Sequence, residues 1–141
     1  MLVPLYVLEA FSGSAKRQAR QVRQLVFTPL HDLEVRGALR RLAGRGGMSA
    51  MQLEEALRLL DGDLTARRLV GMSLDFPRVF ERASELSARY ASKLLCRSLD
   101  VLHVASALEL RIERFVSADD RQIALARECG LAAREVTAGR A

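Results

Sequence analysis

The stretch from Leu99 to Leu108 constrains the fold of this chain more than any other. It begins Leu-Asp-Val-Leu-His-Val-Ala, and the residues after its aspartate are apolar on nearly every side of a helix. The polar side chains of Asp100, His103 and Ser106 stand three positions apart. A helix that is apolar almost all round belongs in an interior, so the stretch predicts a buried helix. Asp100 is then either the N-cap of this helix or a carboxylate held in a site.

The length and composition fit one cytosolic domain over residues 1–141. Half of the residues are apolar, which allows a substantial core and argues against disorder. No apolar run reaches the length of a membrane span, and the N-terminus lacks a secretory pattern. Cys96 and Cys129 lack metal-ligand spacing, so we expect reduced thiols in or near the core. The net charge of +5 suits a nucleic acid or an acidic protein partner.

Short apolar segments alternate with amphipathic ones along the chain. This alternation predicts an α/β layer structure with a mainly parallel sheet. The side chains of Phe76 and Phe80 are expected in the core rather than on a base-stacking surface. The expected strands are 26–28, 68–74, 115–117 and 134–137, and the expected helices include 15–25, 30–42, 76–90 and 120–129. A further helix, with its apolar face from Leu53 to Leu64, is expected to start at the capping box Ser49-Ala-Met-Gln52.

Glu34 lies on the expected inward face of helix 30–42. Helical spacing predicts that the core stripe of this helix runs through Leu30, Leu33, Gly37, Ala38 and Arg41. A carboxylate on an inward face needs a partner, because burying an unpaired charge is costly. Two interpretations stay open: a salt bridge to an arginine, or a carboxylate aimed into a shared acidic site.

Two further acids are placed where such a site would form. Asp119 comes just after strand 115–117, and Glu34 lies one helical turn after strand 26–28. Asp100 begins the helix that leads into the strand before Asp119. Ligands of parallel sheets bind outside the carboxyl ends of the strands, so the three acids are expected to converge there. Clustered carboxylates need a cation to balance them, and a hard divalent ion suits oxygen ligands and phosphodiester cleavage.

Three segments, taken in order, resemble the PIN-domain ribonucleases, and among them the VapC-type toxins of bacterial toxin–antitoxin pairs. The segments are Leu30-x-x-x-Glu34-Val35-x-x-Ala38-Leu39, Leu99-Asp100-Val101-Leu102-His103-Val104-Ala105 and Phe115-Val116-Ser117-Ala118-Asp119. The resemblance implies a three-layer fold of short strands flanked by helices. It also implies a cytoplasmic endoribonuclease that uses Mg²⁺ or Mn²⁺, an acidic antitoxin that neutralises it, and a homodimer.

The resemblance also assigns residues by matching position. It implies that Glu34, Asp100 and Asp119 are the metal-binding and catalytic acids. Ser117 occupies a small hydroxyl position before the last acid, and Asp120 is a spare neighbour or a helix cap. His103, one turn after Asp100, is either an accessory group of the site or a structural histidine.

One part of the family pattern is not found. The family begins with a strand that ends in an aspartate, shortly before a segment like Leu2-Val-Pro-Leu-Tyr-Val7. Met1 falls just after the position of that aspartate, so we expect the reading frame upstream of Met1 to encode this first, central strand. The alternative is a catalytically inactive relative that binds nucleic acid or an antitoxin without cleaving.

Overall fold

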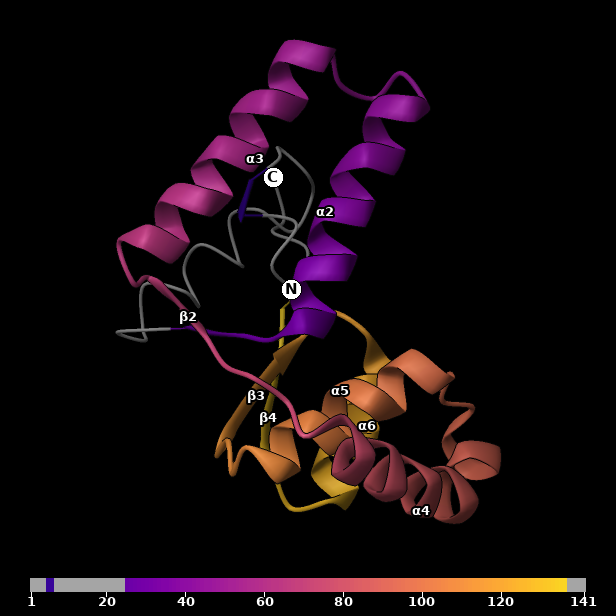
Figure 1. The fold of residues 1–141 in the computed structure, drawn as a ribbon. Coiled ribbons are helices and arrows are strands. Elements are labelled where there is room, and N and C mark those ends of the chain that lie inside the picture. Colours follow the sequence, from indigo (N-terminus) through magenta and orange to yellow (C-terminus); the bar gives the residue numbers. More distant parts are fainter. Residues whose placement is uncertain (1–4, 7–24, 137–141) are drawn as a thin grey trace. The chain divides into compact units, whose positions relative to one another are not determined.

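The computed structural model describes residues 5–6 and 25–136, and it divides into two compact units, each with its own core (Figure 1). The first unit extends to Ser73 and the second begins at Leu74. Helices and short parallel strands make up both units, so the predicted α/β class is confirmed. The expected helix 15–25 lies outside the described residues. The organisation of residues 1–141 as a single domain stays a prediction.

Where the structure describes the first unit, it combines two helices with a parallel strand pair. Strand β1 (Leu25–Phe27) pairs with β2 (Leu69–Gly71), and helices α2 (Pro29–Gly44) and α3 (Ala50–Thr65) lie between them in the chain. Each helix begins with a capping box, in which the backbone and side chains of two residues satisfy each other's hydrogen bonds. The Thr28 N–H donates to His31 Nδ1 over 3.1 Å, and the Ser49 N–H donates to Gln52 Oε1 over 2.8 Å.

The core of the first unit lies on a face of α2 that differs from the predicted stripe. Val35 and Leu39 are buried against Ala56 and Leu60 of α3, whereas Leu33 is 73% exposed. The predicted stripe is therefore wrong at Leu33, which lies about 160° around the helix from Val35. The physical reason is apolar volume, since Val35 and Leu39 bury more carbon than a stripe that contains Gly37, Ala38 and Arg41.

The second unit contains the buried helix that was predicted. Helix α4 (Phe76–Leu94) precedes α5 (Ser98–Glu109), and strand β3 (Arg114–Ser117) pairs in parallel with β4 (Ala132–Glu135) across helix α6 (Asp120–Glu128). Seven of the twelve residues of α5 are buried, which confirms its place in the interior. The core of the unit comprises Val79, Ala83, Leu86, Val101, Val104, Ala105, Leu125 and Ala126.

The aromatic residues at the start of α4 correct a second expectation. Phe76 is 39% and Phe80 is 55% exposed, so neither is a core residue. The aliphatic members of the predicted stripe, Val79, Ala83 and Leu86, are buried as expected, and Phe80 lies about 100° around the helix from Val79. The stripe therefore lies beside the aromatic side chains rather than through them.

Two smaller predictions are confirmed in this unit. Cys96 and Cys129 are free thiols, half-buried against the core. Helix α6 ends before Gly130, whose positive φ of 80° suits a glycine after a helix. No helix among the described residues is long and apolar enough to cross a membrane.

Candidate metal centre

Asp100 is a buried carboxylate with both oxygens hydrogen-bonded. It is the third residue of α5 and only 6% exposed. The Arg97 N–H donates to Oδ2 over 2.8 Å, and the side-chain amide of Gln122 donates to Oδ1 over 3.1 Å. Asp100 therefore accepts the N–H of Arg97, the N-cap residue, from its own position in the first turn of α5. It is not the N-cap itself.

Asp119 is the N-cap of α6 and follows β3 closely, as predicted. Its Oδ1 accepts hydrogen bonds from the backbone N–H groups of Arg121, at 2.9 Å, and Gln122, at 3.3 Å. The guanidinium Nε of Arg121 lies 3.8 Å from the same oxygen, and the Asp119 side chain is 40% exposed. Asp119 is thus the solvent-facing carboxylate and Asp100 the buried one.

Gln122 connects these two carboxylates, which we call the acid pair. Its Nε2 donates to Asp100, and its Oε1 accepts the hydroxyl of Ser117 over 2.8 Å. The Ser117 oxygen in turn accepts the backbone N–H of Asp119 over 3.1 Å. The end of β3 and the starts of α5 and α6 are thereby held together by one hydrogen-bonded network.

Sequence reasoning missed Gln122. The run Asp119-Asp120-Arg121-Gln122 matches a capping box, which predicts that the glutamine side chain turns back to the N–H of its own helix cap. In the structure the Asp119 N–H is taken by Ser117, and the glutamine amide is free to reach Asp100. The buried serine that ends β3 was the signal that could have identified this arrangement.

The donor set of the acid pair suits a hard divalent cation. Each carboxylate oxygen has two lone pairs, so the hydrogen bonds to Asp100 leave acceptor capacity on both oxygens. Mg²⁺ keeps several waters and needs only one or two carboxylates from a protein. Within residues 5–6 and 25–136, no group of three or more His, Cys, Asp and Glu side chains could hold a metal ion.

The negative charge of the acid pair affects the pKa of a neighbouring thiol, that of Cys96. Burial raises the pKa of the Cys96 thiol, and the negative charges of Asp100 and Asp119 raise it further, while Arg121 opposes them. The Cys96 sulfur lies 3.7 Å from the Arg121 carbonyl oxygen. The thiol is therefore close enough to report on the charge of the acid pair.

The other predicted site residues have different surroundings. Glu34 is half-buried on α2 in the first unit, so its approach to the acid pair stays a prediction. Asp120 is exposed as the first residue of α6, and the cap is Asp119 instead. His103 is 7% exposed, one turn after Asp100 in α5, and Ser117 is buried inside the network.

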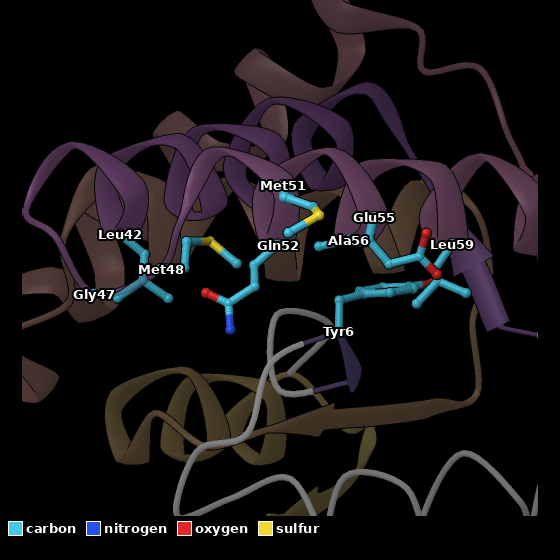
Figure 2. A pocket seen from close by; sticks show the side chains of 9 residues that line it. All are labelled: Tyr6, Leu42, Gly47, Met48, Met51, Gln52, Glu55, Ala56 and Leu59. Carbon is cyan, nitrogen blue, oxygen red and sulfur yellow. The ribbon is translucent and has the colours of Figure 1, made fainter.

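The first unit contains a groove of about 400 Å³ along α3, shown in Figure 2. The Tyr6 hydroxyl at this groove donates to Asp63 Oδ2 over 2.8 Å, and Glu55 in its wall is paired with Arg58. Most of the lining is aliphatic or thioether carbon, which favours an apolar contact rather than chemistry. The lining residues are Tyr6, Leu42, Gly47, Met48, Met51, Gln52, Glu55, Ala56 and Leu59.

Comparison with known proteins identifies a family. The family described as PIN domain matches residues 6–128, a range that covers parts of both units, includes the acid pair and ends before β4. No curated protein and no solved structure matches the chain.

Proposed function

Since this chain belongs to the PIN domain family, we propose that it is a metal-dependent endoribonuclease of the VapC toxin type. Membership of the family indicates a nuclease-type function, an interaction with RNA or another nucleic acid, and the use of a divalent metal. Within the chain, the observation that carries the proposal is the acid pair, linked through Gln122 at the carboxyl end of β3.

In this proposal Asp100, Asp119 and Glu34 hold a Mg²⁺ or Mn²⁺ ion. Such an ion supplies a water of lowered pKa and neutralises charge on a phosphate. Asp100 contributes a carboxylate whose orientation two hydrogen bonds fix. Asp119 contributes one that solvent, and hence the backbone of an RNA, can reach. Ser117 and His103 are accessory groups that support these carboxylates, and Asp120 is a spare neighbour.

Cleavage of a single-stranded RNA with Mg²⁺ or Mn²⁺, with and without a chelator, tests the enzyme. We expect Glu34→Gln, Asp100→Asn and Asp119→Asn each to slow cleavage by about a hundredfold or more, the scale of losing one electrostatic stabiliser. The matched control is Asp120→Asn, which removes the same charge from an exposed neighbour and is expected to cleave like the wild type. Equal losses at Asp119 and Asp120 would contradict the assignment, as would cleavage that survives chelation.

A second candidate function is nucleic-acid or antitoxin binding without cleavage. It is favoured because the hydrogen-bonded network contains two carboxylates, those of Asp100 and Asp119. Its signature is RNA that binds in a filter assay but stays intact with either metal ion. A longer form, with a strand and an aspartate before Met1, separates the two functions. Cleavage by the longer form alone would show that the family's first aspartate is required.

We further propose that this protein is a cytoplasmic homodimer and that an acidic antitoxin binds it. An apolar helix of the antitoxin would lie in the groove of the first unit. The net charge of +5 favours an acidic partner, and Met51 in the groove is 78% exposed. Met51→Glu is expected to abolish co-purification with the neighbouring operon product and to spare cleavage. Leu33→Glu is the control, because Leu33 is 73% exposed and lies outside the groove lining. Binding that survives Met51→Glu would exclude this groove.

A further inference from the structure

Gln122 contacts the three other side chains of the acid pair network, those of Asp100, Ser117 and Asp119. Its side-chain amide meets Asp100 and Ser117, and its backbone N–H meets Asp119. Asp100 belongs to α5 and the other groups belong to β3 and to the start of α6. The glutamine side chain is thus the hydrogen-bonded link from α6 to the buried carboxylate.

The orientation of the Gln122 amide follows from its neighbours. The Ser117 oxygen accepts the Asp119 N–H, so the hydroxyl proton of Ser117 is directed to Gln122 Oε1. The ionised Asp100 carboxylate accepts only, so it faces the Nε2 donor. If the amide were reversed, its N–H donor would face the hydroxyl donor of Ser117, and its carbonyl oxygen would face the carboxylate oxygen of Asp100. One amide orientation therefore satisfies all the groups.

This orientation fixes the Asp100 carboxylate from two sides. The Arg97 N–H holds Oδ2 at the start of α5, and Gln122 holds Oδ1 from α6. Both donors are neutral, so they stabilise the carboxylate without placing a cationic side chain on it. A carboxylate held in this way keeps its negative charge available to a bound ion, and it loses no rotational freedom when the ion binds.

We propose that Gln122 is a positioning residue of the cation site, which holds the Asp100 carboxylate in the orientation that a divalent ion requires. The inference rests on the proposed function, because that function supplies the ion. Partners that orient a metal-binding side chain typically change metal affinity by about 10- to 100-fold.

The test is calorimetric titration of the full chain with MnCl₂, without RNA. Gln122→Met keeps the length of the side chain and removes both of its hydrogen bonds, and we expect it to weaken Mn²⁺ binding about tenfold. The matched control is Gln52→Met, which makes the same replacement in the capping box of α3 and is expected to bind Mn²⁺ like the wild type. Thermal unfolding of each variant, with and without Mn²⁺, accompanies the titration.

Gln122→Glu is the second variant, and it decides the matter if Gln122→Met does not fold. It places a third carboxylate against Asp100, so the melting temperature without metal is expected to fall. Mn²⁺ then relieves the repulsion, and the rise in melting temperature on adding Mn²⁺ is expected to exceed that of the wild type. A lower melting temperature with an unchanged response to Mn²⁺, in either variant, would show a purely structural glutamine and overturn the inference. Failure of the wild type to bind Mn²⁺ would instead overturn the proposed cation site itself.

Discussion

The backbone N–H of Arg121 lies 2.9 Å from the Asp119 carboxylate, so one side chain both caps helix α6 and belongs to the acid pair. These two roles depend on different properties of the side chain. A cap needs an acceptor oxygen, whereas a cation ligand of this kind needs the negative charge.

Two substitutions at Asp119 are expected to separate these roles. Asp119→Asn keeps a capping oxygen and should unfold in urea close to the wild type, whereas Asp119→Ala loses the cap and about 1 kcal/mol of stability. Both variants are expected to lose Mn²⁺ binding in the titration. Equal stability of the alanine and asparagine variants would show that the cap contributes nothing.

The same replacement at Asp100 is expected to destabilise the protein. Both Asp100 oxygens accept hydrogen bonds, so an amide NH₂ at this position would face either the Arg97 N–H or the Gln122 amide donor. We expect Asp100→Asn to lower the free energy of unfolding by about 1–3 kcal/mol, measured by urea unfolding. Asp120→Asn provides the exposed comparison, and equal stability of the two variants would contradict the buried network.

The thiols are expected to react slowly with iodoacetamide, because burial raises the pKa of both Cys96 and Cys129. Asp119→Asn removes a negative charge that raises the pKa of Cys96, so the thiolate fraction and the alkylation rate of Cys96 should increase. Cys129 is the internal control, since Glu128 is the acid that raises its pKa. Mass spectrometry of both peptides over time measures the rates. Equal acceleration of the two thiols would indicate general loosening instead.

Tyr6 is expected to make stability fall at alkaline pH. Burial, and then the hydrogen bond to Asp63, raise the pKa of Tyr6 above its ordinary value of 10.0. The folded state therefore favours the protonated phenol. Its contribution is fully present below about pH 10 and is lost as pH rises from there toward the folded-state pKa. Tyr6→Phe should cost about 1 kcal/mol at neutral pH and show a smaller alkaline decrease in the free energy of unfolding. Tyr90→Phe is the control, expected to retain the full decrease.

The sequence predicted features that depend on local pattern and missed those that depend on packing choices. The apolar residues on nearly every side of α5 predicted its burial correctly. The position of Asp119 directly after a strand was predicted from the neighbouring residues of the sequence. Leu33 and Phe80 were misplaced because helical spacing permits several adjacent faces, and the facing element selects among them. Gln122 was missed because its local partner, the Asp119 N–H, was already taken by Ser117. The convergence of Glu34 with the acid pair involves separate units, and it stays a prediction.

All the hydrogen bonds that fix the acid pair lie between Arg97 and Gln122. The hydrogen bond with the largest sequence separation joins Gln122 to Asp100, 22 positions apart. Forming it therefore closes a short loop of chain, at a modest entropic cost. Contacts of short sequence separation form early in folding. We therefore expect the carboxylates to adopt their native geometry as soon as α6 docks against α5, ahead of the pairing of β1 with β2, whose Leu25 and Leu69 are much farther apart in sequence.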